Sequence, residues 1–164
     1  MEGDVAGFEE IDALAFRPDG TLWAWAQGQG LIQIDTGNAD SSLVLPYDGE
    51  IEGLTWDVEG RILYAVENEH GGRDPDSETD TQGVILWAYN YEDGVVKAKC
   101  DLLDEGVSEV ESLETLPDNT LLFSYHNANQ FVSGRIKPDS CRTTPLSVDF
   151  EMPYRDVEGF ALVD

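Results

Sequence analysis

The residues best suited to chemistry in this sequence are carboxylates that recur in a short motif. Four segments follow the order acid, β-branched residue, acid, small residue, apolar residue, and they begin at Glu10, Glu50, Glu109 and Asp156. Because side chains alternate along a β-strand, the two acids of each copy are expected to share one face. Carboxylates arranged in this way are ligands for a hard cation such as Ca²⁺.

The second acid of each copy is the candidate metal ligand. If the four copies surround a common axis, these carboxylates form a ring whose mutual repulsion a calcium ion would relieve. The alternative is structural, with each carboxylate accepting backbone N–H bonds that hold neighbouring repeats in register. The predicted ligands are Asp12, Glu52, Glu111 and Glu158.

A second set of acids lies in a long polar loop at 69–83, between two apolar runs. These acids occur at alternate positions, as the first ligands of a calcium loop do. The glycine and the final glutamate of an EF-hand loop are missing, so a solvated loop is the alternative. The additional candidate ligands are Asp74, Asp76, Glu78 and Asp80.

The two histidines follow equivalent apolar runs of successive repeats. Equivalent places lie on the same face, so these segments are expected to line the mouth of a channel and to bind a polar ligand. His70 and His126 are the catalytic candidates, although the sequence has no Gly-x-Ser-x-Gly, His-Glu-x-x-His or phosphate-binding loop. The predicted mouth residues are Gln27, Glu67, Asn68, Glu69, His126 and Asn127.

The elements that must position these residues are β-strands. Each of the first three motif copies is followed by a turn signal and a second apolar run, as in Pro18-Asp19-Gly20 before Leu22–Trp25. Spacings of 40, 59 and 47 residues separate Ile11, Ile51, Val110 and Val157, and they match four-stranded β-propeller blades. The sequence therefore predicts an all-β chain of about three blades plus one extra inner strand.

The predicted blades cover residues 8–48, 49–107 and 108–154 of a single partial propeller domain, 1–164, and the last strand covers 155–164. The fourth strand of the third blade is expected at Leu146–Phe150. Propellers typically have four to eight blades, so we expect either a partial ring or a ring completed by oligomerisation. Packing between blades best explains the tryptophans at Trp23, Trp25, Trp56 and Trp87.

The charge and the cysteines restrict partners and location. The chain has 34 acidic and 9 basic residues and a formal net charge of -25, which argues against nucleic acid as a partner. It contains no apolar run long enough to enter a bilayer. If the protein is secreted, with a signal outside this chain, Cys100 and Cys141 of neighbouring blades could form a disulfide; the alternative is two buried thiols.

The motif resembles the SdiA-regulated and phytase-like esterase propellers, in which a Glu-Gly pair recurs on the innermost strand. Glu52-Gly53 and Glu158-Gly159 match best, and Glu67-Asn68-Glu69 follows the second strand in a similar way. Asp12-Ala13 and Glu111-Ser112 depart from the pair. The resemblance implies an extracytoplasmic protein that holds calcium in a central channel.

Three functions follow from these observations. The first is a non-enzymatic, calcium-associated propeller module of a secreted, periplasmic or cell-surface protein, which binds a protein or a glycan. The second is a phytase-like esterase or phosphatase that uses channel calcium. The third is a propeller fragment that self-assembles into a ring as a homo-oligomer. The nine basic residues are scattered, so a phosphate site is hard to assemble and the first function is favoured.

Overall fold

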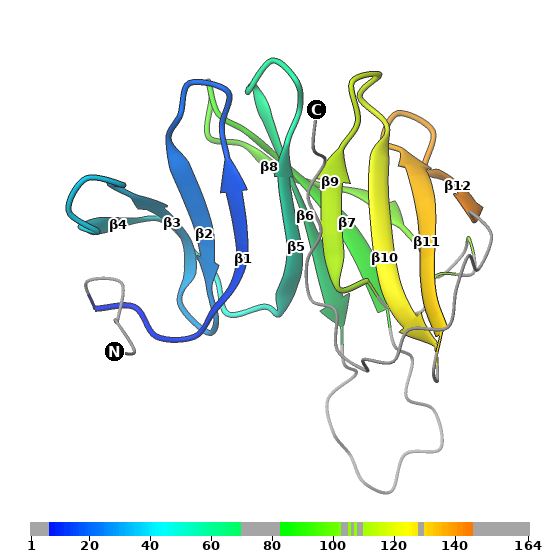
Figure 1. Ribbon diagram of the computed structural model, residues 1–164, viewed down its shortest axis with the longest axis horizontal. Coiled ribbons are helices and arrows are strands. Elements are labelled where there is room, and N and C mark those ends of the chain that lie inside the picture. The colour runs from blue at the N-terminus through cyan, green and yellow to red at the C-terminus, as the bar shows by residue number, and fades with distance from the viewer. Residues whose placement is uncertain are drawn as a thin grey trace, which may run out of the picture.

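The computed structural model describes residues 7–69, 83–102, 105, 107, 110–127 and 130–145. Within these ranges the chain forms three four-stranded antiparallel sheets, which lie side by side in Figure 1. The all-β prediction is confirmed, and the described sheets do not close a ring. No helix that these residues form is long and apolar enough to cross a membrane.

Each sheet is one propeller blade whose strands pair in the order of the chain. Blade 1 contains β1 (Ile11–Phe16), β2 (Leu22–Ala26), β3 (Gly30–Ile34) and β4 (Ser41–Pro46). Blade 2 contains β5 (Ile51–Trp56), β6 (Ile62–Glu69), β7 (Gly83–Asn90) and β8 (Val96–Asp101). Blade 3 contains β9 (Ser112–Thr115), β10 (Leu121–Asn127), β11 (Gln130–Lys137) and β12 (Arg142–Pro145).

The fourth strand of blade 3 begins earlier than the sequence suggests. The expected segment, Leu146–Phe150, lies outside the described residues, whereas β12 already pairs with β11 from Arg142. The cause is a tight turn, in which the backbone N–H groups of Ser140 and Cys141 both donate to the Lys137 carbonyl, at 3.1 and 2.9 Å. Pairing therefore starts immediately after Cys141.

The three blades pack face to face, with their first strands closest together. β1 contacts β5, and β5 contacts β9. One apolar core fills the space between blades 1 and 2, and another fills the space between blades 2 and 3. Trp23, Trp25 and Trp56 are buried in the first of these cores, which confirms their predicted packing role, while Trp87 is only partly buried.

The first strands of blades 1 and 2 each contain a β-bulge at the second acid of the motif. Asp12 and Glu52 are the extra residues, because the pairing register shifts between Ile11 and Ala13 and between Ile51 and Gly53. A bulge locally breaks the alternation of side chains. The shared face of the two acids in each copy therefore stays a prediction.

Candidate functional site

The predicted ligand ring is only partly visible. Asp12, Glu52 and Glu111 are partly buried at the beginning of the first-strand region of each blade, and Glu158 lies outside the described residues. No three histidine, cysteine, aspartate or glutamate side chains among the described residues are arranged to hold a metal ion. The calcium site therefore stays a prediction. The loop candidates Asp74, Asp76, Glu78 and Asp80 also lie outside the described residues.

Of the predicted mouth residues, Asn68 has the best-defined contacts. Its Nδ2 donates to the Val110 carbonyl at 2.8 Å, and its Oδ1 accepts from the Val110 N–H at 3.1 Å. Asn68 and Val110 are both buried. The Asn68 amide thus joins the second strand of blade 2 to the chain that enters blade 3.

Gln27 occupies the corresponding place in blade 1. Its N–H donates to the Glu10 carbonyl at 2.9 Å, as the Asn68 N–H donates to the Glu50 carbonyl at 3.1 Å. The Gln27 Oε1 atom is buried without a hydrogen-bond partner. Its mouth role stays a prediction, as do those of His70, which lies outside the described residues, and of Glu69, His126 and Asn127, whose side chains are not described.

Glu67 lies next to Asn68 but faces the other neighbouring blade. Its carboxylate is buried and accepts two hydrogen bonds, from the Tyr47 hydroxyl at 2.8 Å and from the Trp87 Nε1–H at 2.6 Å. Tyr47 follows β4 of blade 1, so this contact joins blades 1 and 2. Gly49 passes so close to Glu67 and Tyr47 that a Cβ atom there would overlap both side chains. The sequence carries no signal for Tyr47 as a partner, because only the folded chain brings it to Glu67.

An apolar hollow of about 180 Å³ lies beside this contact, between blades 1 and 2. Buried aliphatic side chains of both blades line it, among them Leu31, Leu54 and Leu63. Four aromatic side chains complete most of its wall: Trp25, Tyr47, Trp87 and Tyr89. The hollow can receive a small apolar group.

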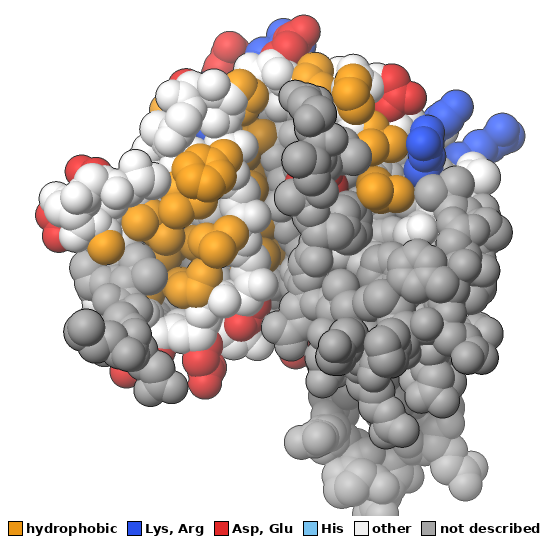
Figure 2. All heavy atoms as spheres, in the orientation of Figure 1, with side chains coloured by type: hydrophobic (Ala, Val, Ile, Leu, Met, Phe, Trp, Pro, Cys, Tyr) orange, Lys and Arg blue, Asp and Glu red, His pale blue; other side chains and the backbone are white. Residues whose placement is uncertain are grey.

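Blade 1 carries an open apolar face on its other side. Leu14 and Phe16 are 59% and 65% exposed, whereas Leu54 and Trp56, at the same motif positions of blade 2, are each 4% exposed because they pack on blade 1. Ala24 and Ile32, which the strand register places on the same face as Leu14, are fully buried, so the exposed part of this face is formed by Leu14 and Phe16. We call this surface the open face of blade 1, and Figure 2 shows apolar side chains gathered over this part of the molecule.

The opposite end of the molecule is cationic. Ile136 of β11 is buried toward blade 2, so Arg135 and Lys137 alternate to the outward face. Arg142 pairs with Lys137 on that face, and all three cationic residues are exposed. In Figure 2, Lys and Arg side chains gather at this end, away from the apolar patch. On β9 of the same sheet, burial raises the pKa of Glu114.

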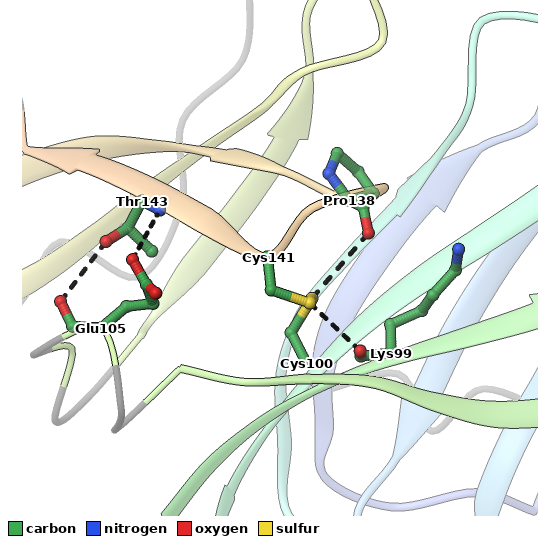
Figure 3. The surroundings of a disulfide bond; sticks show 6 residues. All are labelled: Lys99, Cys100, Glu105, Pro138, Cys141 and Thr143. Carbon is green, nitrogen blue, oxygen red and sulfur yellow. Dashed lines mark hydrogen bonds between the residues drawn. A yellow bond between two sulfur atoms is a disulfide. The ribbon is translucent and has the colours of Figure 1, made fainter.

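Cys100 and Cys141 form a disulfide that links β8 of blade 2 to the turn before β12 of blade 3 (Figure 3). Their Cα atoms are 5.4 Å apart, and the residues are separated by 41 positions. Beside the disulfide, Thr143 donates through its N–H to a Glu105 carboxylate oxygen and through its hydroxyl to the Glu105 carbonyl, both at 3.4 Å. The outer strands of blades 2 and 3 are therefore covalently joined.

Comparison with known proteins supports the fold. No protein-family model and no curated protein matches this chain. An auxiliary nutrient binding protein from Bacteroides thetaiotaomicron matches with a TM-score of 0.60 at 18% identity, over 91% of this chain and 33% of its own. TolB from Acinetobacter baumannii matches with a TM-score of 0.61 at 9% identity, over 87% of this chain and 33% of its own.

A putative gluconolactonase matches with a TM-score of 0.58 at 14% identity, over 91% of this chain and 52% of its own. The chain has the fold of a β-propeller segment. It spans between a third and about half of the length of these three proteins. At such identities the likeness shows the fold alone, and the resemblance to the SdiA-regulated and phytase-like esterase propellers stays a prediction.

Proposed function

We propose that this chain is a non-enzymatic binding module of an extracytoplasmic protein, and that the open face of blade 1 binds a second copy of the chain to build a larger ring. The observation that carries this proposal is the contrast between equivalent residues. Phe16 is largely exposed, while Trp56, at the same place in blade 2, is buried by the preceding blade. An exposed apolar face of this kind marks a protein interface.

Chain length favours a second copy as the occupant. This chain spans 52% of the putative gluconolactonase and 48% of a luciferin-regenerating enzyme. Two copies would therefore supply about as much chain as one complete propeller of that size. A head-to-tail contact made twice closes a two-fold ring.

Charge favours the same arrangement. The outward face of blade 3 carries Arg135, Lys137 and Arg142, whereas exposed acids such as Glu9 and Asp40 border blade 1. Joining the cationic end of one copy to the acidic, apolar end of the other pairs opposite charges, which selects this orientation over a contact between two acidic ends.

The disulfide supports an extracytoplasmic location, because disulfides persist in oxidising compartments. Two of the similar structures are described as an auxiliary nutrient binding protein and as the extracellular domain of a putative one component system. The ligand that we propose for the finished ring is a protein or a glycan. A channel calcium, if present, would be held by the acids Asp12, Glu52, Glu111 and Glu158.

The test is the mass of the chain in solution, measured by light scattering over a wide range of concentrations. We expect a species of twice 18.1 kDa. Phe16→Glu should weaken the association about 10³- to 10⁴-fold, because burial of a phenylalanine contributes about 2–3 kcal/mol and the ring contains the contact twice. Val58→Glu is the matched control, since Val58 is an exposed apolar residue in the β5–β6 turn.

Two outcomes would contradict the proposal. A chain that remains at 18.1 kDa at every concentration would show that a second copy does not bind. A dimer that Phe16→Glu and Val58→Glu affect equally would show that the open face of blade 1 is not the contact. Circular dichroism of both variants establishes that they are folded.

A further inference from the structure

The space between blades 1 and 2 is filled by different side chains from those in the equivalent space between blades 2 and 3. This difference leaves the hollow between blades 1 and 2. In each of blades 2 and 3, one second-strand residue pairs with the leucine that ends the recurring motif. In blade 3 this residue is Phe123, which is buried and packs so closely on Gly134 that a Cβ atom there would overlap its ring. In blade 2 it is Ala65, which pairs with Trp87 and leaves room between the blades.

The outer end of the space also differs between the two pairs. Cys100 of β8 pairs with Leu86, next to a register shift in the sheet. Leu45 of β4 pairs with Leu31, next to the same kind of shift in blade 1. Cys100 is joined covalently to blade 3. Leu45, at the equivalent place in blade 1, cannot form such a covalent link and instead lines the hollow. The space between blades 1 and 2 therefore remains open where the other is closed.

The aromatic walls are held in place by bonds to protein atoms. Tyr47 and Trp87 both donate to Glu67, at 2.8 and 2.6 Å, and the Trp25 Nε1–H donates to the Gly49 carbonyl at 3.1 Å. Their polar atoms are thus satisfied within the chain, and what they offer to the hollow is carbon. A site whose walls are already ordered loses little entropy when it binds a ligand.

The size and lining of the hollow define the ligand. A cavity of about 150 Å³ lined by apolar side chains accommodates benzene, and this hollow measures about 180 Å³. A charged group inside it would lose its hydration without a new partner, since both Glu67 oxygens already accept hydrogen bonds. We propose that the hollow binds a neutral single-ring aromatic molecule with a small substituent.

This site is independent of the proposed ring. The hollow lies between blades 1 and 2, whereas the open face is on the other side of blade 1. Ligand binding and association can therefore fail separately, and light scattering distinguishes the two failures.

Titration calorimetry and thermal unfolding of the full chain test the site, with toluene as the probe. Benzoate and benzylammonium carry the same ring with a negative or a positive charge. We expect saturable binding of toluene, and a midpoint rise of about 3 °C or more at ten times its dissociation constant. The two charged molecules should bind at least tenfold more weakly.

Two variants fill the hollow in different ways. Ala65→Leu adds volume on β6, and Leu45→Phe adds a ring on β4; each should weaken toluene binding at least tenfold. Leu43→Phe is the matched control, because Leu43 is an exposed residue of the same strand that does not line the hollow. It should bind toluene as the unmodified chain does.

The proposal is overturned if toluene produces no saturable heat and no midpoint rise. It is also overturned if Ala65→Leu and Leu45→Phe both bind toluene as tightly as Leu43→Phe does. Tighter binding of benzylammonium than of toluene would refute the neutral ligand, and would assign the hollow to a cation that the aromatic rings and Glu67 attract.

Discussion

The contact between Asn68 and Val110 gives a sharp test of how the blades are joined. Asn68 both donates to and accepts from the Val110 backbone, at 2.8 and 3.1 Å, across the boundary between blades 2 and 3. Both residues are buried, Val110 completely. Asn68→Ala therefore removes the partners of two backbone groups that water does not reach.

The expected loss of stability follows from these two groups. A buried polar group left without a partner costs about 1–3 kcal/mol, so the pair should cost about 2–6 kcal/mol. For a chain of this length each kcal/mol shifts the unfolding midpoint by about 2–4 °C. Asn68→Ala should accordingly lower the midpoint by about 4–24 °C.

Asn38→Ala is a matched control. The Asn38 side chain also makes two reciprocal hydrogen bonds, donating to the Asp40 carboxylate and accepting from the Asp40 N–H, both at 2.9 Å. That contact is exposed, so water can replace it, and the loss should stay near or below about 0.5–1 kcal/mol. Calorimetry or circular dichroism measures both midpoints. If the two alanine variants unfold at the same temperature, the role given to Asn68 is refuted.

Four further predictions concern the disulfide, a partly buried carboxyl, the net charge and calcium. Replacing Cys100 and Cys141 by serine should cost about 3–4 kcal/mol in urea unfolding, because the bond closes a loop of 41 residues; an unchanged midpoint would contradict this. Burial raises the folded pKa of Glu114 above its ordinary 4.5, so stability falls as pH rises from about that value through the folded pKa. Glu114→Gln should therefore raise the midpoint at neutral pH and leave it unchanged well below the ordinary pKa, and a less stable variant at neutral pH would show that the carboxylate is needed. The net charge of -25 predicts a higher midpoint in molar NaCl than at low salt, since screening weakens the repulsion. If calcium binds Asp12, Glu52, Glu111 and Glu158, it should raise the unfolding midpoint above its value in NaCl of the same ionic strength. Glu52→Gln should then abolish this additional rise in the midpoint.

The repeated features of the fold could be predicted from the sequence. Each motif copy in the described residues lies on or next to the first strand of a blade, and the turn after it leads into the second strand. These signals are local, because a few turn residues and an apolar run determine each hairpin. Trp23 and Trp56 are buried between blades for the same reason, since they alternate with residues of the opposite face.

The features that do not repeat could not be predicted. Glu67 and Asn68 are adjacent in the chain, which predicts that both lie at the channel mouth. On β6 they face opposite blades, Glu67 toward Tyr47 of the segment after β4 and Asn68 toward Val110 before β9. Their partners are 20 and 42 residues away, so only the assembled blades reveal them. The bulges at Asp12 and Glu52 likewise have no local signal in the motif.

The turn after the first strand of a blade makes different contacts at the two blade boundaries. Between blades 1 and 2, Arg17 donates to the Gly60 carbonyl at 2.8 Å and lies 3.7 Å above the Tyr91 ring. Between blades 2 and 3, the Val58 N–H donates instead to the Asn119 side chain at 3.1 Å. Strand-forming residues recur because every blade needs the same backbone pairing, whereas the residues that join blades differ at each boundary. A boundary can therefore be changed without losing the blades beside it, which is why one space is closed by a disulfide and the other keeps a hollow.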